Sequence, residues 1–314
     1  MNSTGDNTNM SKVSTAIHLL KTPGQMILPL AEYGFFNWMS DEMYLKFVYK
    51  GVLGRELNLI RPQLFTEKIQ WLKLHDRKER YIKLVDKVLV KEFVREQIGD
   101  SIIVPTIGVW NCVDDICFDD LPNQFVLKCN HDSGSVIICK DKSKFDLKSA
   151  KVRLKKRLNK NSYYWGREWP YKHVERKIMA EKLLEDNNSL TRELTDYKFY
   201  CFNGNPAYCQ VITNRSTTEK IDFFDMDWNH QPFVGLTPNV HNSSGVIQPP
   251  ANFQYMKEYS TLLSKDTYFC RVDFYEVNNE LYFGEITFYP KGGFGVFTPE
   301  GWDYKLGMMI QLPI

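Results

Sequence analysis

Residues 271–287 read RVDFYEVNNELYFGEIT, the most informative segment of the chain. Two runs of β-prone residues flank a pair of asparagines, and this pattern predicts a β-hairpin. Because strand side chains alternate between the faces of a sheet, the length of the turn decides which acids lie together. A two-residue turn would pair Asp273 with Gly284, so that Asp273 and Glu285 face opposite ways. A three-residue turn over 278–280 would pair Asp273 with Glu285.

The three-residue turn is the preferred prediction because it separates polar from apolar side chains. It also pairs Val277 with Leu281. One face of the hairpin would carry Arg271, Asp273, Glu285 and Thr287. The other face would carry Val272, Phe274, Tyr282 and Ile286.

Two carboxylates on adjacent strands repel each other unless a cation neutralises them. A hard cation does so, and Mg²⁺ is commonly held by one or two carboxylates together with substrate phosphates. The alternative is a surface cluster in which Arg271 forms salt bridges with Asp273 and Glu285. The pattern of residues alone leaves both interpretations open.

A second polar group, Lys128, interrupts the apolar segment 125–129. A lysine in such a strand requires an anionic partner, and the small-residue loop 133–135 can offer backbone N–H groups to phosphates. Alternatively, Lys128 extends along a hairpin to water. Other polar groups inside apolar elements are Asp86, Lys87, Asp196, Lys198 and Arg215.

The composition is that of an ordinary globular protein. The 314 residues are enough for one large or two ordinary domains, and 40 Lys and Arg against 38 Asp and Glu leave a net charge of +2. This near balance argues against a nucleic-acid-binding protein, which normally has a large basic excess. The seven cysteines show no metal-binding spacing, which predicts reduced thiols in a cytoplasmic protein.

Local patterns predict the elements around these groups. Ser40 and Thr66 are candidate caps for helices over 41–49 and 67–74, and Gly51 would end the first. Further helices are predicted over 80–97 and 146–160. Residues 102–110 are predicted to be extended, with a break at Pro105, and strands are predicted over 125–129, 136–139, 197–202, 207–213, 221–224, 268–277 and 281–288. Residues 174–184 begin as a helix, and their end fits a strand equally well.

In this order the motifs resemble the ATP-grasp fold, and more closely the TupA-like ATP-grasp family of cell-surface polysaccharide gene clusters. The resemblance covers about residues 55–312. Its five motifs are Phe65-x-Glu67-Lys68-Ile69-Gln70-Trp71-Leu72, Asp86-Lys87, Phe125-Val126-Leu127-Lys128-x-Asn130-His131, Asp196-Tyr197-Lys198-Phe199-x-Cys201-Phe202-x-Gly204, and Arg271-x-Asp273-Phe274-Tyr275 with Phe283-Gly284-Glu285-Ile286-Thr287.

The resemblance implies a role for each matching residue. Lys87 and Lys128 would bind the phosphates of the nucleotide, and a loop over the phosphates would contain His131, Ser133, Gly134 and Ser135. The hinge would contribute Glu181 and Leu183, and Asp196 would also bind the nucleotide. The catalytic residues would be Lys198, Arg215 and Arg271. The Mg²⁺ ligands would be Asp273, Glu285 and Thr287. Because Thr287 stands where the family pattern has Asn, the number of metal ions stays open.

The predicted fold class is α+β, an ATP-grasp fold. Two α/β lobes with antiparallel sheets would sandwich the nucleotide, and a helical extension would precede them. The predicted units are a tail with a helical extension at 1–60, a helical segment at 61–120, a lobe with the phosphate loop at 121–184, and a lobe with the Mg²⁺-binding hairpin at 185–314.

The resemblance implies an ATP- and Mg²⁺-dependent ligase that joins a carboxylate to an amine through an acyl phosphate. Cations and Mg²⁺ supply what phosphoryl transfer needs, because it depends on positioning and charge neutralisation. The expected substrates are a uronic acid of a surface polysaccharide or its precursor and an amino acid or amine. The alternatives are a phosphoryl transferase of the same fold, or a capsule or O-antigen glycosyltransferase whose Asp273 and Glu285 hold a metal and a sugar nucleotide.

Two further segments suggest surface contacts. The predicted helix carries seven Lys and Arg and no acid over 148–160. It is either a solvated face or a site for an anionic glycan or membrane surface. The apolar segment 17–39 is too interrupted to span a bilayer, and it would contact a membrane or form a dimer contact. The expected location is the cytoplasm, with peripheral contact at the inner face of the membrane as a further hypothesis.

Overall fold

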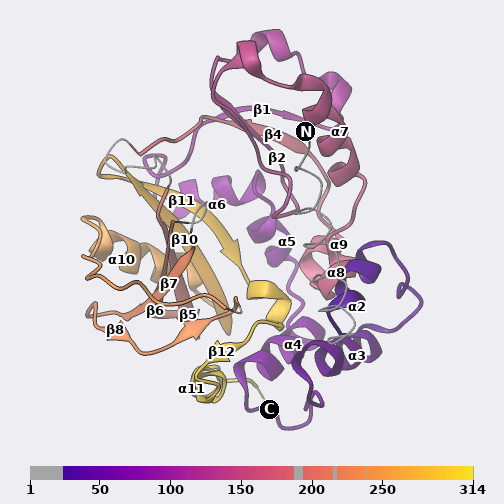
Figure 1. The fold of residues 1–314 in the computed structure, drawn as a ribbon, viewed down its shortest axis with the longest axis vertical. Helices are drawn as coiled ribbons and strands as arrows, with labels where there is room; N and C mark the ends of the chain where they lie inside the picture. Colours follow the sequence, from indigo (N-terminus) through magenta and orange to yellow (C-terminus); the bar gives the residue numbers. More distant parts are fainter. Residues whose placement is uncertain (1–23, 187–193, 215–217, 238, 314) are drawn as a thin grey trace, which may run out of the picture.

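The structure, a computed structural model, describes residues 24–186, 194–214, 218–237 and 239–313. Two antiparallel sheets dominate it, the smaller at the top of Figure 1 and the larger on the left. The smaller sheet has the order β1 (Thr106–Trp110), β4 (Ile178–Glu181), β2 (Phe125–Cys129), β3 (Ile137–Cys139). The larger has the order β11 (Glu280–Thr287), β10 (Phe269–Val277), β5 (Asp196–Phe202), β6 (Asn205–Thr213), β7 (Lys220–Asp225), β8 (His230–Gln231). A two-stranded ribbon joins β12 (Phe297–Thr298) to β9 (Val234–Gly235).

The smaller sheet buries one face under α7 (Leu147–Leu158). Alternation places Phe125, Leu127 and Cys129 on this face, where they pack with Leu154. Lys128 therefore points to the opposite face, which is the face that Glu181 shares. The strand pattern thus separates the core of this lobe from a charged surface.

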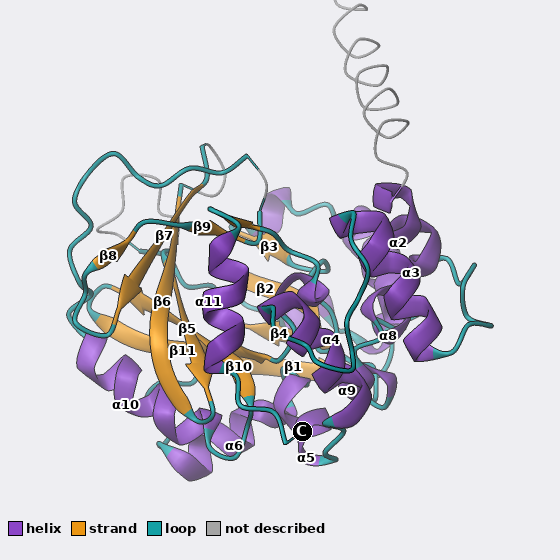
Figure 2. Ribbon diagram, turned by 90° about the horizontal axis from the view of Figure 1, so that it is seen from below, coloured by secondary structure: helices purple, strands orange, loops and turns teal. Residues whose placement is uncertain are grey.

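The larger sheet is covered on one face by α10 (Phe253–Ser264), as Figure 2 shows. Phe199 on β5 packs against Phe253 and against Phe274 on β10. The residues that alternate with these, among them Lys198 and Asp273, point to the other face. That face carries the charged groups described below.

The remaining helices lie between and beside the sheets (Figure 1). They are α2 (Gly24–Glu32), α3 (Asp41–Leu53), α4 (Phe65–His75), α5 (Arg80–Val85), α6 (Leu89–Gln97), α8 (Tyr163–Gly166), α9 (Trp169–Lys172) and α11 (Gly301–Met309). Short 3-10 turns span Val113–Asp115, Phe118–Asp120, Lys142–Lys144 and Pro290–Gly293. Helices α2 and α3, which correspond to the predicted helical extension, share a hydrophobic cluster that also includes Leu57 and Phe294. The predicted boundaries between units stay a prediction.

Several helix ends differ from the predictions. Ser40 caps α3 as predicted, because its side chain accepts a hydrogen bond from the Met43 amide. The helix runs past Gly51 and ends at Gly54, whose φ of 71° is left-handed. Thr66 is not a cap, since it lies inside α4 and its hydroxyl donates to Asp303 at 2.8 Å.

Three longer-range features also differ. The predicted helix over 80–97 is divided into α5 and α6 around Asp86 and Lys87. Residues 174–177 form no helix, whereas the strand alternative for the segment's end is confirmed by β4. Helices α10 and α11 were not predicted, since weak amphipathic patterns gave no clear signal.

The β10–β11 hairpin confirms the predicted pairing of Asp273 with Glu285, but its turn differs from the predicted one. Asp273 pairs with Glu285, but Val277 pairs with Glu280, so the three-residue turn is wrong. Asn278 and Asn279 form a two-residue turn with φ of 53° and 67°. The register then shifts by one residue at Gly284, which has no partner between the Asp273 and Phe274 pairs. This is a β-bulge, and it carries the two acids onto one face.

The bulge also moves Tyr282. Tyr282 pairs with Tyr275, two residues after Asp273, so it shares the face of Asp273 and not the predicted apolar face. Gly284 suits the bulge because an added Cβ would lie 3.0 Å from the Asp273 carbonyl oxygen. Close backbone approach therefore favours glycine at this position.

The seven cysteines are all free, and Cys129, Cys139, Cys201, Cys209 and Cys270 are buried. Their redox state stays a prediction. Among the described residues, no helix combines the length and the apolarity needed to cross a bilayer.

Candidate functional site

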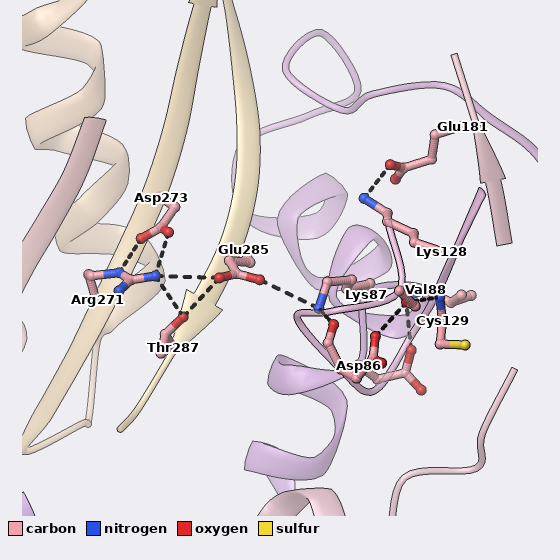
Figure 3. Close-up of polar contacts among 12 residues, drawn as sticks. Asp86, Lys87, Val88, Lys128, Cys129, Glu181, Arg271, Asp273, Glu285 and Thr287 are labelled. Atoms are coloured by element: carbon pink, nitrogen blue, oxygen red, sulfur yellow. Dashed lines mark hydrogen bonds and ion pairs between the residues drawn. The ribbon is translucent and has the colours of Figure 1, made fainter. Parts of the chain in front are cut away.

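Arg271 is the centre of the hairpin's polar face (Figure 3). Its Nε donates to Asp273 Oδ1 at 2.6 Å and its Nη2 to Asp273 Oδ2 at 2.7 Å. The same Nη2 donates to Thr287 Oγ1 at 3.2 Å and lies 3.4 Å from Glu285 Oε1. The predicted grouping of these four side chains on one face is therefore confirmed.

The charged row continues across the sheet to β5 and β6. Lys198 pairs in register with Asp273, and its ammonium contacts the Asp273 carboxylate and lies 3.0 Å from Asp196 Oδ1. Gln210 is next in the row, opposite Lys198 on β6. Strands β11, β10 and β5 thus present acids and cations to one surface, and β6 adds a neutral amide.

Lys87 approaches this surface from the α5–α6 connection. The Asp86 carboxylate accepts hydrogen bonds from the amides of Val88 at 2.8 Å and Leu89 at 3.3 Å, so it caps α6. The chain turns at this cap, and Lys87 Nζ lies 3.5 Å from Glu285 Oε2. Figure 3 shows Glu285 pointing from β11 toward Lys87.

The smaller sheet contributes a second charged group. The Glu181 carboxylate binds Lys128 through one oxygen, and Lys91 Nζ lies 2.5 Å from the other. Burial raises the pKa of Glu181, but the charges of Lys128 and Lys91 outweigh burial and the pKa is lowered. Glu181 is therefore held as a carboxylate between two lysines.

The predicted phosphate loop is ordered by His131 and Ser135, both buried. His131 Nε2 lies 3.0 Å from the Lys160 carbonyl oxygen, and burial lowers the pKa of this histidine. Ser135 Oγ accepts from the Cys129 amide at 2.7 Å. Ser133 and Gly134 are exposed at the tip, where a ligand has access.

Two other predicted positions remain, Leu183 and Arg215, and the turn after the hairpin adds Lys291. Leu183 follows β4 and is half-buried. Lys291 lies in the left-handed turn after β11, with φ of 50°. Arg215 lies outside the described residues, so its predicted role stays a prediction.

Glu285 has the most perturbed acidity of the site. Burial raises its pKa, yet the charges of Lys87, Arg271, Lys198 and Lys128 outweigh burial and lower the pKa to about 2. The charge of Lys128 therefore reaches the hairpin from the smaller sheet. The pKa of Arg271 is raised despite its burial, mainly by Asp273.

The donor set suits a hard cation. Asp273 and Glu285 offer carboxylate oxygens, and Thr287 Oγ1 lies 3.2 Å from Glu285 Oε1. Among the described residues, no three or more His, Cys, Asp and Glu side chains gather as a metal site. Mg²⁺ commonly uses only one or two carboxylates with substrate phosphates, so the two acids with Thr287 fit this ion.

Sequence reasoning missed two members of this arrangement. Lys91 lies on the amphipathic helix α6, and the sequence pattern does not distinguish it from a solvent-exposed lysine. Only the folded structure shows its contact with Glu181. Gln210 is buried on β6 and accepts from the Tyr200 hydroxyl at 3.3 Å. The alternation of β6 was the available signal for Gln210, since its even positions include one polar residue among apolar ones.

Together these groups can bind and neutralise a polyanion. Lys87, Lys128, Lys198 and Arg271 all act on the potential at Glu285. Preorganised cations of this kind stabilise the charge that develops on a transferred phosphoryl group. The chemistry favoured by the site is therefore phosphoryl transfer.

Comparisons with known proteins agree with this chemistry. The family model described as TupA-like ATPgrasp matches residues 67–311, more than half of the chain. The match confirms the predicted ATP-grasp fold class and the predicted family. No curated protein sequence matches the chain significantly.

Solved structures give more distant likenesses. A D-alanine–D-alanine ligase from Bacillus anthracis complexed with ATP is 17% identical, with 73% of this chain and 63% of that chain covered and a TM-score of 0.43. The D-alanine–D-alanine ligase of Helicobacter pylori is 14% identical, with coverage of 78% and 69% and a TM-score of 0.44. An L-amino acid ligase from Bacillus licheniformis is 12% identical, with coverage of 85% and 55% and a TM-score of 0.40. Likeness at this level carries no argument about the reaction.

Proposed function

Since the chain belongs to the TupA-like ATP-grasp family, we propose that it is an ATP- and Mg²⁺-dependent carboxylate–amine ligase. The observation that carries the proposal is the convergence of cations on Glu285. Lys87 comes from the α5–α6 connection, Lys128 from the smaller sheet, and Lys198 and Arg271 from the larger sheet. A site assembled from three parts of the fold suits the phosphates of a nucleotide.

The reaction has two steps. A substrate carboxylate oxygen attacks the γ-phosphorus of ATP, which forms an acyl phosphate and releases ADP. The ammonium group of the second substrate loses a proton to solvent, its nitrogen attacks the acyl carbon, phosphate leaves with the bonding electrons, and the nitrogen releases a second proton as the amide forms. Since no covalent bond to the protein is needed, positioning and charge neutralisation account for catalysis.

The side chains divide this work. Lys87 and Lys128 bind the α- and β-phosphates, with Ser133 and Gly134 of the loop His131–Ser135 over them. Lys198 and Arg271 neutralise the transferring phosphoryl group, and Arg215 has the same proposed role. When bound, Mg²⁺ supplies a positive charge held by Asp273, Glu285 and Thr287.

The base of the nucleotide belongs, in this proposal, beside β4 and the residues after it. Glu181 and Leu183 would form this hinge, and Asp196 supports Lys198 on the opposite sheet. The ion pair of Asp196 with Lys198 and that of Glu181 with Lys128 support the proposal. Each would hold a lysine beside the phosphates.

The proposed carboxylate is a uronic acid of a surface polysaccharide or its precursor, and the amine is an amino acid or another amine. Membership in the TupA-like family supports this choice. The proposed products are capsule or lipopolysaccharide precursors, and the proposed location of the reaction is the cytoplasm.

We further propose peripheral contact with an anionic membrane surface. Tyr33, Phe35 and Trp38 are 67%, 64% and 76% exposed, and aromatic side chains of this kind favour the headgroup region. Lys160, just after the basic helix α7, lies 5.1 Å from the centre of the Tyr33 ring. The aromatic and basic surfaces therefore adjoin, as in an interfacial binding face.

A ligand comparison tests the nucleotide part of the proposal. ATP with Mg²⁺ should raise the unfolding midpoint, because a ligand that binds only the native state stabilises it. UDP-glucose with Mg²⁺ should not. A rise with UDP-glucose alone would favour a glycosyltransferase and overturn the ligase.

The products test the chemistry. ADP and phosphate should appear together only when an amine and a uronic acid are both present. A stable phosphorylated product formed without the amine would indicate a phosphoryl transferase instead. Mass spectrometry of the surface polysaccharide from a deletion strain should show loss of the amine substituent.

A further inference from the structure

Glu168 lies in the connection between α8 and α9, beside the turn that follows the hairpin. Lys73 Nζ donates to the carbonyl oxygens of Gly166 and Gly292, both at 2.6 Å. One ammonium group thus joins this connection to the turn. Gly292 also packs closely on Trp165, since an added Cβ would lie 2.6 Å from the indole ring. These contacts hold the α8–α9 connection, which includes Glu168, beside the turn Pro290–Gly293 that follows the hairpin.

The backbone before Glu168 is firmly held. Arg167 has a left-handed φ of 53° and is 2% exposed. Its guanidinium donates to the Phe36 carbonyl oxygen at 2.7 Å and lies 4.5 Å from the centre of the Tyr44 ring. A residue fixed in this way determines the direction of the chain that follows it.

The charges of the candidate site act on Glu168. Burial and then the charge of Glu285 raise the pKa of Glu168 to about 7, although Lys73 opposes them. Tyr171 lies three residues further on, and burial, Glu168 and Glu285 raise its pKa while Arg271 lowers it. Helix α5 packs against both α9 and β11, so the helix that begins after Glu168 and the strand that carries Glu285 lie against the same helix.

Glu168 differs from the other acids of the site in having no partner. Within the described ranges its carboxylate makes no hydrogen bond and no ion pair within 4.0 Å. Asp196, Asp273, Glu181 and Glu285 each contact a lysine or arginine. Lys73 attracts Glu168 but donates instead to two carbonyl groups. Glu168 therefore feels the charge of Lys73 without contacting it, and a partly buried carboxylate with no cation in direct contact is stabilised by a ligand that brings one.

Resting on the proposed ligase function, we propose that Glu168 is the binding site for the ammonium group of the amine substrate. An amine reaches the protein as a cation at neutral pH. Glu168 is half-buried and so remains accessible to a ligand. Its carboxylate holds the nitrogen beside the place where the acyl phosphate forms. Glu168 is a specificity-determining group, and no covalent step passes through it.

Binding of a simple ammonium ion tests this role without any reaction. The probe is glycinamide, a primary ammonium without a carboxylate, and acetamide is its uncharged counterpart. The full-length protein, loaded with ADP and Mg²⁺, should bind glycinamide and not acetamide in ligand-observed NMR. Glu168→Gln should weaken glycinamide binding about tenfold or more, as expected for loss of a charge-assisted hydrogen bond. Glu258→Gln on the exposed face of α10 is the matched control and should bind as the wild type does.

Kinetics with two nucleophiles give a second readout. With glucuronic acid as the carboxylate, Glu168→Gln should raise the KM for glycinamide about tenfold. The KM for hydroxylamine, which is uncharged at neutral pH, should change by less than about twofold. Glu168→Asp should recover part of the difference. Equal effects on both nucleophiles would overturn the proposal.

The outcomes separate this proposal from the proposed function. If ATP and Mg²⁺ fail to stabilise the wild type, the ligase function fails. If they stabilise both the wild type and Glu168→Gln, the variant is folded and its nucleotide site is intact. Unchanged glycinamide binding in that folded variant would then exclude Glu168 as the ammonium site.

Discussion

Lys87 Nζ lies 3.5 Å from Glu285 Oε2, although the first residue interrupts a helical region and the second lies on the edge strand of the larger sheet. The contact exists because Asp86 ends one helix and caps the next. It joins the α5–α6 connection to the hairpin that carries the two paired acids. Each prediction below depends on such contacts between distant segments.

Lys87→Met should weaken ATP binding about tenfold to a hundredfold, because a phosphate loses one charge-assisted contact. It should also move the pKa of Glu285 back toward its ordinary value, since Lys87 is the largest of the charges that lower it. ATP titration by calorimetry measures the first effect. Lys83→Met on the exposed face of α5 is the matched control, and equal losses in both variants would contradict the assignment.

Glu285→Ala should reduce ATP-dependent turnover about a hundredfold to a thousandfold, as loss of a preorganised charge group does. The fold should persist, because Arg271 keeps both of its contacts with Asp273. Phosphate release and the far-ultraviolet dichroism spectrum measure the two quantities. Glu280→Gln, at the exposed end of the same strand, should keep wild-type turnover. Retained ligation by Glu285→Ala would remove this residue from the proposed metal set.

Gly284→Ala should lower the free energy of unfolding by about 1–3 kcal/mol, because the new Cβ meets the Asp273 carbonyl oxygen. Turnover should fall with it, since the bulge aligns Asp273 with Glu285. Denaturant unfolding gives the stability change. Gly245→Ala is the control, because its added Cβ meets nothing within 4 Å. If both variants are equally stable, the bulge does not require glycine.

The stability of the metal- and nucleotide-free protein should fall as the pH is lowered from about 5 to about 2. The pKa of Glu285 is lowered to about 2 from an ordinary 4.5, so the unfolded chain takes up this proton at higher pH than the folded chain does. The stability that this carboxylate contributes is present above about pH 5 and lost as the pH falls. Glu285→Gln should show a shallower decline in the unfolding midpoint. Parallel curves for the variant and the wild type would refute the assigned acidity.

Binding to vesicles that contain phosphatidylserine should decrease steeply with added salt, because the contact of α7 is electrostatic. The double variant Lys155→Glu and Lys156→Glu should lose most binding at low salt. Lys265→Glu with Lys305→Glu carries the same change of net charge on other elements and is the control. Sedimentation with the vesicles measures both, and salt-independent binding would contradict the proposed surface.

Much of the site was predictable from local patterns. Alternation identified β10 and β11, and the lysine inside an apolar strand identified Lys128. The contact of Asp273 with Arg271 was predictable because these residues are two positions apart on one strand, so that their side chains lie on the same face. In contrast, the turn length was predicted wrongly, because a two-residue turn with a bulge and a three-residue turn bring the same acids together. Positive φ at Asn278 and Asn279 favours the former, and only the closed sheet reveals the compensating shift.

The sequence alone determined which residue types recur, in which order, and on which face of each strand they lie. These properties depend on neighbours along the chain, so they were enough to predict the hairpin and the cationic positions and to identify the family resemblance. The tertiary structure decided the partners: Lys91 with Glu181, Lys87 with Glu285, and the unpaired Glu168. Charge interactions depend on distance and burial between segments far apart in the chain. Spacing along the sequence therefore cannot supply them.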